Sequence, residues 1–283
     1  MDLVELQIFK AVAEQGGITR AATALHRVQS NVTTRVKQLE ARLGAKLFHR
    51  QGRRLVLSSE GRLLLEYADR LLRLSTEAQA AIKKHAPHGV FRLGALESTA
   101  ATRLPPVLAA YHRAHPGVRL ELVTGTSGAL VDRVLRGEIE AAFVAEPFSV
   151  KRLEMQHAFT EELVLITPRG HGRVSTPKEL ESRVLLAFPT GCSYRRRLET
   201  WLGRASVVAE RVMEYGSYHA ITACVAAGGG IAVVPRSVLR VVGAETQLAV
   251  HALPPQVSKA RTMLVWPRGH QSGALAALRE GLG

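Results

Sequence analysis

The fold of the first part of this chain is decided by residues 29–43, QSNVTTRVKQLEARL. Val32, Val36, Leu39 and Leu43 recur at steps of four, three and four residues, which predicts a helix with one narrow apolar stripe. Ser30 or Asn31 offers the N-cap, so we expect the helix over roughly residues 30–43. At about 100° per residue, the opposite face carries Ser30, Thr34, Lys37, Gln38 and Ala41, with Thr33 and Arg35 on its flanks.

Two shorter segments come before this helix. Residues 2–15 repeat apolar side chains at helical spacing, and Gly16-Gly17 ends that helix. Residues 19–25 form a short second helix whose small side chains let two helices cross closely, and the chain turns at residues 26–29. A short helix, a tight turn and a second helix are typical of the helix-turn-helix unit.

A basic hairpin is predicted directly after these helices. Phe48 is expected to anchor a strand beneath the core, and residues 55–57, Leu-Val-Leu, form the returning strand. Gly52 permits a tight turn that presents Arg53 and Arg54. Two arginines at a hairpin tip suit a wing that lies along the phosphate backbone or in the minor groove of DNA.

The polar face of residues 30–43 has two interpretations. An ordinary solvated face explains it when the helix is taken alone, but small hydroxyls, an amide and a cation are also the groups that meet base edges and phosphates in a major groove. The turn before the helix and the wing after it favour DNA binding. The predicted DNA contacts are Thr19, Gln29, Ser30, Asn31, Thr33, Thr34, Arg35, Lys37, Gln38, Arg50, Arg53 and Arg54.

A longer pattern extends over the first sixty or so residues. It comprises Ala21-Ala22-x-x-Leu25, Gln29-Ser30-Asn31-Val32-Thr33, Leu39-Glu40-x-x-Leu43-Gly44-x-x-Leu47-Phe48-x-Arg50 and Leu57-Ser58-x-x-Gly61. This pattern resembles the signature of LysR-type transcriptional regulators. The turn at residues 26–28 and the adjacent Thr33 and Thr34 depart from the family's usual arrangement, which bears on the operator that is read and not on DNA binding itself. The resemblance implies a sequence-specific regulator of transcription that is controlled by a small-molecule effector.

A long helix is predicted from Glu60 to about Lys84, a stretch with no proline and one glycine. Its heptad-like seam comprises Leu64, Ala68, Leu71, Ser75, Ala78 and Ile82, and Leu63, Leu65, Leu72 and Leu74 widen it. Such an apolar helix needs a cover, which is either the chain's own domains or a second copy, and we favour the second copy. LysR-like proteins pair through linker helices, so the resemblance implies a homodimer or homotetramer on double-stranded operator DNA, with RNA polymerase left open as a further partner.

After Gly89 the chain alternates strand-like and helical segments, which predicts a βα-layered domain. The expected strands are 90–96, 118–123, 141–145, 163–167, 184–187, 207–213, 231–234 and 261–266, and the expected helices are 99–112, 129–136, 194–202 and 218–227, with a late segment at 273–282. The resemblance implies a two-lobed α/β effector domain like the periplasmic binding proteins, and an α/β multidomain chain. The predicted domains are a winged helix-turn-helix at 1–58, a linker helix at 59–86 and an effector domain at 87–283, with lobe 1 at about 89–160 and 262–283 and lobe 2 at about 161–261.

Polar residues follow several of these strands, where ligands bind in open α/β sheets. The candidate effector contacts are Glu97, Ser98, Thr99, Thr126, Ser127, Glu146, Cys192, Ser193, Tyr194, Arg195, Tyr218 and His219. Any one hydroxyl among them is explained as an ordinary helix N-cap, and it is their convergence that favours a ligand. Free N–H groups at helix starts favour a carboxylate-bearing effector, whereas Glu97 or Glu146 would meet an amine.

Three short sequence segments point to a particular subgroup of the LysR family. Residues 96–101, 192–196 and 217–219 look like those of a LysR subgroup that includes the putrescine-utilisation regulator, which points toward amine or amino-acid metabolism. Cys192 invites comparison with redox sensors, but nothing in the sequence indicates a depressed thiol pKa, and Cys224 is expected in the core.

The composition of the chain limits the kinds of partner, cofactor and cellular location that it can have. A net charge of +14 indicates a polyanion partner, although some basic proteins have none, and residues 1–60 carry only part of that excess. The two cysteines and the eleven histidines show no metal-ligand spacing, so no metal or cofactor is expected. The acidic N-terminus and the lack of a long apolar run favour the cytoplasm and exclude a membrane-spanning chain.

Two functions other than regulation are less consistent with the sequence. An enzyme is disfavoured because residues 125–128 lack nucleophile-elbow spacing and Gly228-Gly229-Gly230 follows a helix and does not link a strand to one, as a dinucleotide loop would. A non-specific nucleoid protein would not need so large a second domain. The sequence leaves open the effector, the operator, the direction of regulation and the number of subunits.

Overall fold

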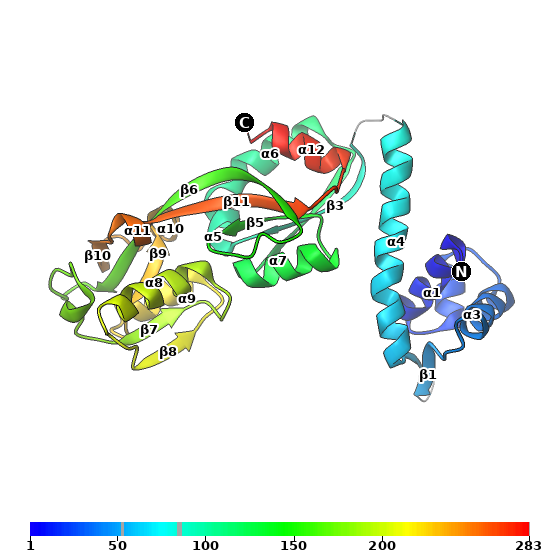
Figure 1. Cartoon of the computed structure of the whole chain (residues 1–283), viewed down its shortest axis with the longest axis horizontal. Helices are drawn as coiled ribbons and strands as arrows, with labels where there is room; N and C mark the ends of the chain where they lie inside the picture. Colours follow the sequence, from blue (N-terminus) through cyan, green and yellow to red (C-terminus); the bar gives the residue numbers. More distant parts are fainter. Residues whose placement is uncertain (52–53, 84–86, 283) are drawn as a thin grey trace. The chain divides into compact units, whose positions relative to one another are not determined.

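The computed structural model describes residues 1–51, 54–83 and 87–282, with only the backbone at 73, 77 and 80–83. The chain forms two compact units, Met1–His85 and Ala86–Gly283 (Figure 1). The first unit contains α1 (Leu3–Gln15), α2 (Ile18–Ala24), α3 (Gln29–Leu43), β1 (Phe48–Gln51), β2 (Arg54–Leu57) and α4 (Ser59–Lys83).

The core of the first unit has two parts on either side of α1. Ile8 and Val12 pack with the buried alanines of α2 and with Val32 and Val36 of α3. Leu6 and Phe9 pack on the other side with Leu39, Leu47 and the linker helix α4. Phe48 contacts both parts, and its ring lies 5.4 Å from that of Phe9. These contacts confirm the anchoring role predicted for Phe48.

The start of α3 differs from the sequence-based prediction. The helix begins at Gln29 with Val28 as its N-cap, and no side chain caps it. His26 takes a left-handed conformation, with φ of 51°, and turns the chain early enough for the helix to start before the predicted caps. Ser30 and Asn31 therefore lie in the first turn as exposed residues, and their predicted capping role was wrong.

A buried carboxylate joins α3 to the wing. Glu40 accepts hydrogen bonds from the Leu47 backbone N–H and from Lys46 Nζ, both at 2.9 Å. Burial alone would raise the pKa of Glu40, but these hydrogen bonds outweigh it and hold the pKa below its ordinary value. Glu40 therefore fixes the point where the chain leaves the helix for β1, a role that its position in the sequence motif did not reveal.

The start of α4 explains the motif Leu57-Ser58-x-x-Gly61. Ser58 is buried, donates to the Lys46 backbone oxygen at 2.6 Å and accepts from the Gly61 N–H at 2.8 Å. A Cβ on Gly61 would lie 2.1 Å from the Leu47 oxygen, so only glycine fits this crossing. The hydroxyl and the missing side chain together lock the wing against the linker helix.

The second unit is built on one mixed sheet. Its elements are β3 (Gly89–Ala95), α5 (Glu97–Thr102), α6 (Leu104–Ala114), β4 (Val118–Thr124), α7 (Ser127–Arg136), β5 (Ala141–Ala145), β6 (Leu153–Pro168), the 3-10 helix η1 (Pro177–Glu179), β7 (Val184–Ala187), α8 (Ser193–Arg204), β8 (Arg211–Glu214), α9 (Tyr218–Ala226), β9 (Ala232–Pro235), α10 (Arg236–Val242), β10 (Leu248–Ala252), α11 (Pro255–Ser258), β11 (Lys259–Pro267) and α12 (Gly273–Glu280).

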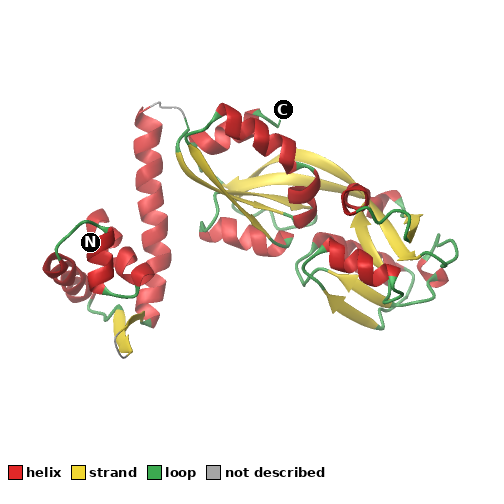
Figure 2. Ribbon diagram, turned by 180° about the vertical axis from the view of Figure 1, so that it is seen from behind, coloured by secondary structure: helices red, strands yellow, loops and turns green. Residues whose placement is uncertain are grey.

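Two long strands connect the two halves of this unit. The strand order is β10-β6-β11-β5-β3-β4, with β9 also paired to β6 and a separate pair β7-β8. β6 and β11 run antiparallel side by side and extend from one half to the other (Figure 1). Helices cover both faces of the β3-β4-β5 region, α6 and α12 on one side and α7 on the other (Figure 2).

Several predicted boundaries of the second unit were wrong. The helix expected over 99–112 is two helices, α5 and α6, separated at Arg103. The strand expected over 163–167 is the end of the much longer β6, because residues 154–162 are only partly apolar and pair along the sheet edge with β11. The sequence pattern also missed α10, β10 and α11, which are four to seven residues long and too short for a clear period.

Candidate nucleic-acid interface and effector cavity

The polar face of α3 is open to solvent. Val32, Val36 and Leu39 are buried in the core of the first unit, and Leu43, the last residue of the predicted stripe, is 41% exposed. Burial of the first three fixes the rotation of the helix about its axis. The predicted contact residues Gln29, Ser30, Asn31, Thr34, Lys37 and Gln38 are consequently exposed.

Two predicted contacts on the flanks of α3 are half-buried. Thr33 donates its hydroxyl to the Gln29 backbone oxygen at 2.9 Å, which leaves only its acceptor capacity for a ligand. Arg35 Nη1 lies 3.9 Å from the Asp2 carboxylate. Both residues border the open face, so a duplex on that face would meet them at its edge.

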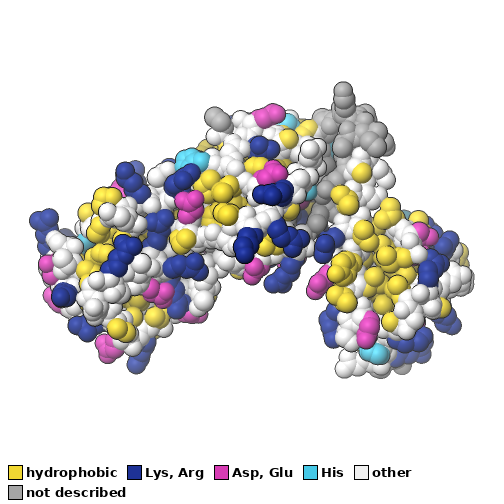
Figure 3. Space-filling model, viewed as in Figure 1, with side chains coloured by type: hydrophobic (Ala, Val, Ile, Leu, Met, Phe, Trp, Pro, Cys, Tyr) yellow, Lys and Arg dark blue, Asp and Glu magenta, His cyan; other side chains and the backbone are white. Residues whose placement is uncertain are grey.

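The remaining predicted contacts lie on α2 and the wing. Thr19 is exposed on α2, and Arg50 and Arg54 are exposed on β1 and β2. The two strands pair from Phe48 with Leu57 to Gln51 with Arg54, which gives the predicted hairpin. Gly52 and Arg53 lie outside the described residues. Lys and Arg side chains are spread over both units in Figure 3, so charge does not locate the interface.

A small cavity lies in the second unit, where the start of α5 and the chain after β4 meet α8 and α9. Its volume is about 20 Å³, room for about one water molecule. It brings together six of the predicted effector residues: Glu97, Thr126, Cys192, Ser193, Tyr194 and Tyr218. Leu96, Gly125 and Phe188 also line it and were not predicted, because apolar residues and a glycine carry no signal for ligand binding in the sequence.

Three predicted effector residues use their polar groups inside the protein. Ser127 Oγ donates to the Ala145 oxygen at 3.0 Å and accepts from the Ala145 N–H at 3.1 Å. Ser193 Oγ lies 2.9 Å from Ser127 Oγ and 2.5 Å from the Ala145 backbone oxygen. Arg195 forms ion pairs with Glu199 and Glu214 at 2.8 and 2.6 Å. The two serines hold the end of β5 and the start of α8 together, and Arg195 connects α8 to β8.

Other polar groups around the cavity are buried without a partner. They are Glu97 Oε2, Ser98 Oγ, Thr99 Oγ1, Tyr194 Oη and Thr262 Oγ1, none of which has a partner at good hydrogen-bond geometry. Ser98 and Thr262 still lie close enough to Tyr194 to interact with its hydroxyl, so Glu97 Oε2 is the clearer case of an unsatisfied group. A buried polar atom without a hydrogen bond costs about 1–3 kcal/mol, so these groups need an explanation. Of these residues, Glu97 and Tyr194 line the cavity itself.

Burial controls ionisation at this site. Burial raises the pKa of the Glu97 carboxyl, and the Tyr218 backbone N–H and the nearby His219 only partly oppose it. Burial also raises the pKa of Tyr194 and Tyr218, so both phenols are neutral at pH 7. Glu97 is therefore the acidic side chain of the cavity lining, and burial disfavours its charged form.

Burial raises the pKa of the Cys192 thiol as well. A reactive redox cysteine needs the opposite shift, because the thiolate is the nucleophile. Cys224 is half-buried and packs against the core around α9, as predicted.

The structure does not bring the remaining predicted effector residues to the cavity wall. Ser98 and Thr99 are buried on α5 beside it, and His219 is exposed at the start of α9. Glu146 lines a different hollow further along α8, and its carboxylate lies 4.0 Å from Arg261.

Comparisons with known proteins agree with this architecture. The family described as "Bacterial regulatory helix-turn-helix protein, lysR family" matches residues 3–62, and the family described as "LysR substrate binding domain" matches residues 84–283. The chain belongs to the LysR family of transcriptional regulators. It is therefore a DNA-binding regulator with an effector-binding domain.

Relatives of this LysR regulator match over nearly its whole length. The HTH-type transcriptional regulator YusT of Bacillus subtilis (strain 168) is 41% identical over 266 residues, which cover 94% of this chain and 89% of that protein. GltR of the same strain is 36% identical and covers 94% of this chain and 90% of that protein. These relatives are transcriptional regulators and not enzymes, as predicted. Their names do not support the narrower resemblance to the putrescine-utilisation regulator.

Solved structures share the fold of this LysR regulator. The crystal structure of full-length CbnR complexed with its target DNA has a TM-score of 0.69, with 25% identity over 100% of this chain and 99% of that chain. A full-length OxyR variant from Pseudomonas aeruginosa has a TM-score of 0.74, with 20% identity over 100% of this chain and 94% of that chain. At this identity the likeness is evidence for a shared fold and for nothing more. Within the described part of the regulator, no helix is long and apolar enough to cross a membrane, and no three potential metal ligands gather.

Proposed function

We propose that this regulator reads a two-fold-related operator as a homodimer and that an amine-bearing small molecule controls it. The observation that carries the DNA part is the open polar face of α3. Thr34 and Gln38 are exposed one turn apart at its centre, with Lys37 beside them. A hydroxyl and an amide suit base edges, and a lysine suits a phosphate. CbnR, solved with its target DNA, supports this assignment by analogy.

The homodimer follows from the exposed side of α4. Leu64, Leu65, Ala68 and Leu72, part of the predicted seam, pack on the core of their own unit and do not need a second copy to cover them. On the rest of the helix, Leu63, Tyr67, Leu71 and Leu74 are 57%, 50%, 38% and 61% exposed. Their spacing of four, four and three residues forms one stripe. We assign this stripe to pairing with the α4 of a second copy, which would place two α3 helices on related half-sites.

The effector assignment rests on Glu97. Its poorly solvated carboxylate has one oxygen without a partner, and no cation lines the cavity with it. An ammonium group would supply both the counter-charge and the hydrogen bond. Among the predicted contacts, Glu97, Thr126, Cys192, Tyr194 and Tyr218 would face such a ligand from the wall and Ser98 and Thr99 from behind it, while Ser127, Ser193 and Arg195 would hold the walls.

A cavity of about 20 Å³ is too small for a metabolite, so the effector must bind a more open arrangement of the two halves. A ligand that binds the open arrangement better shifts the population toward it. Coupling through α4 would then change how the two α3 helices meet the operator. The predicted domain limits, the cytoplasmic location and RNA polymerase as a partner stay predictions.

The experiment that tests this proposal is selection of genomic fragments bound by the full chain, followed by footprinting. Two protected half-sites about one helical turn apart, or multiples of it, are expected. A panel of diamines, amino acids and carboxylates is then added. A changed footprint with amines alone supports the effector class, and uniform protection of random DNA would overturn the operator assignment.

A further inference from the structure

A second hollow lies further along α8 than the effector cavity, which adjoins the start of that helix. It is an open groove of about 490 Å³ and shares no lining residue with the cavity. One wall is Glu146, Pro147, Phe148 and Val150, which follow β5. The other is formed by α8, with Gln256 and Val257 of α11. The groove has the volume of an ordinary small-molecule site.

Three arginines of α8 line this groove against a single glutamate. Arg197 donates from Nε to the Glu146 backbone oxygen at 3.1 Å and from Nη1 to the Gln256 oxygen at 3.2 Å. Arg196 and Arg204 are exposed. Among the described residues, none of the three has a carboxylate within 4.0 Å, and Glu146 lies that far from Arg261. The groove therefore carries an excess of unpaired positive charge.

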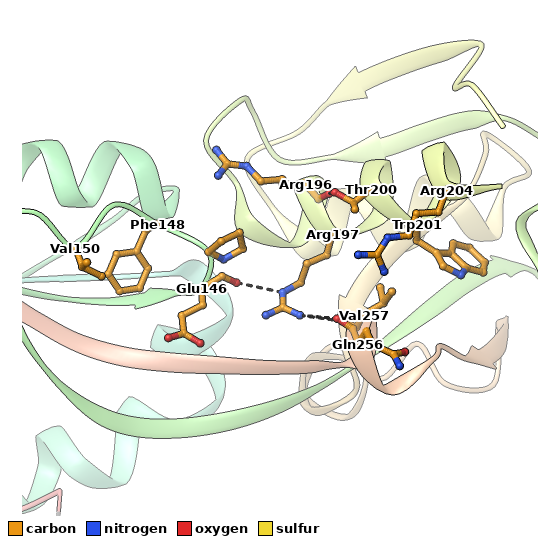
Figure 4. A pocket seen from close by; sticks show the side chains of 11 residues that line it. Glu146, Phe148, Val150, Arg196, Arg197, Thr200, Trp201, Arg204, Gln256 and Val257 are labelled. Atoms are coloured by element: carbon orange, nitrogen blue, oxygen red, sulfur yellow. Dashed lines mark hydrogen bonds between the residues drawn. The ribbon is translucent and has the colours of Figure 1, made fainter. Parts of the chain in front are cut away.

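Arg197 is the half-buried member of this group. Burial lowers its pKa from the ordinary value, which means that its charge is partly desolvated. Its hydrogen bonds to three carbonyl oxygens, those of Glu146, Gln256 and Val257, orient the guanidinium but do not neutralise it. Figure 4 shows Arg197 reaching across toward Glu146, with Arg204 extending from the same helix toward the groove. An oriented cation without a counter-ion is prepared for an anion.

The floor of the groove is apolar. Trp201, Phe148 and Val257 line it, and Trp201 is only 8% exposed while Val257 is buried. Aromatic walls with a few charged groups are the usual composition of a small-molecule site, where the apolar surface binds the body of the ligand and the charges orient its head. An inorganic ion alone would leave this surface unused.

We propose that the groove binds a small organic anion with a flat apolar body and a carboxylate or phosphate head, at a site separate from the effector cavity. The head meets Arg204 and Arg197, and the body lies against Phe148 on the wall that follows β5. Because the two walls come from the chain after β5 and from α8, an occupant bridges both halves of the second unit. This site does not depend on the amine effector proposed above.

The probe for this site is 8-anilinonaphthalene-1-sulfonate, an aromatic anion whose fluorescence accepts energy from tryptophan. The chain has two tryptophans, so Trp266→Phe leaves Trp201 as the only donor. Titration of the full-length Trp266→Phe variant is expected to give saturable energy transfer, and Trp201→Phe with Trp266 retained is expected to give weaker transfer, because Trp266 does not line the groove. Energy transfer that survives in Trp201→Phe with equal strength would overturn the proposal.

The charge requirement is tested with Arg196→Gln/Arg204→Gln, which removes no side-chain hydrogen bond or ion pair among the described residues. The dissociation constant of the probe should rise about tenfold, since each exposed cation contributes about threefold. Arg169→Gln, an exposed arginine after β6, is the matched control and should bind like the parent. Equal affinity in the double variant, with an unchanged circular dichroism spectrum, would overturn the proposal.

Two competitors distinguish the head groups. Displacement of the probe by sodium benzoate indicates a carboxylate site, and displacement by phenyl phosphate at lower concentration indicates a phosphate site. Failure of both at millimolar concentration would overturn the proposal. Glu97→Gln should bind the probe like the parent, so this result separates the groove from the effector cavity.

Discussion

On α3 most side chains assigned to DNA are exposed, whereas at the effector cavity the polar groups are largely buried and Glu97 has an oxygen without a partner. The difference follows from the ligands. A duplex is long and rigid and is met by a surface whose side chains stay hydrated until it docks. A small molecule must be surrounded, so its site contains polar groups that only the ligand satisfies. Exposure marks the first kind of site, and unsatisfied burial marks the second.

The largest effect is expected from the exposed apolar stripe of α4. This stripe is exposed on the first unit, but we assign it to a second copy of the chain and not to DNA. Leu71→Asp/Leu74→Asp should place charges in the dimer interface and lower operator affinity at least about hundredfold, because a monomer holds one half-site. Sedimentation and operator titration measure the two consequences together. Thr76→Asp, an exposed change elsewhere on α4, is the control, and a dimer that persists in the double variant would contradict the assignment.

The next largest effect is expected at Glu40, a buried carboxylate whose two oxygens both accept hydrogen bonds. Glu40→Gln should lower the local free energy of unfolding by about 2 kcal/mol, because hydrogen bonds to a charged group are worth about 1.5–3 kcal/mol. Hydrogen exchange of α3 and β1 amides should accelerate roughly thirtyfold. Since the folded pKa lies below the ordinary value of 4.5, the stabilisation is present above that pH and is lost as pH falls through the folded pKa.

A smaller effect is expected at the exposed face itself. Lys37→Ala should weaken operator binding about tenfold and reduce the slope of log affinity against log salt by about one, as expected for a lost phosphate contact. Thr34→Val and Gln38→Ala should instead change the ranking of operator sequences. Lys151→Ala, an exposed lysine of the second unit, should leave binding unchanged. Parental binding by all three α3 variants would show that this face does not read DNA.

The smallest effect is expected at Glu97. Its pKa is raised by burial, so the protonated carboxyl favours the folded state at low pH and that contribution is lost as pH rises through the folded pKa. Glu97→Gln should therefore raise the melting temperature of the effector-free protein slightly at pH 7 and abolish the stabilisation by amines. Melting temperatures measured at pH 5 and pH 7, with and without amines, check both the pH dependence and the loss of stabilisation by amines. Amines that stabilise the variant as strongly as the parent would exclude Glu97 as their contact.

Prediction from sequence worked best where one period extends along a whole helix. The step of Val32, Val36 and Leu39 fixed which side of α3 is buried, and the alternation after Gly89 gave most strands of the second unit within a few residues. It failed where a neighbour overrides the local pattern. Leu64 and Ala68 belong to the same apolar seam as Leu71, but they pack on Phe9 and Leu39 while Leu71 stays exposed.

The candidate effector residues show the same limit. Ser127, Ser193 and Arg195 look like ligand contacts in the sequence, but their polar groups are used by Ala145, Glu199 and Glu214. A residue type indicates which bonds a side chain can form, and only its neighbours in space decide whether those bonds are free.

The sequence by itself determined the family, the winged helix-turn-helix, the rotation of α3 and the α/β character of the second part, because each depends on a local period or a contiguous motif. The tertiary structure alone decided which side of α4 is uncovered, which polar groups around Glu97 lack partners and that three arginines of α8 share a groove with Trp201. Those properties depend on contacts between residues far apart in the chain, such as α8 with Phe148 and Val257 in the groove, and no pattern along one segment contains them.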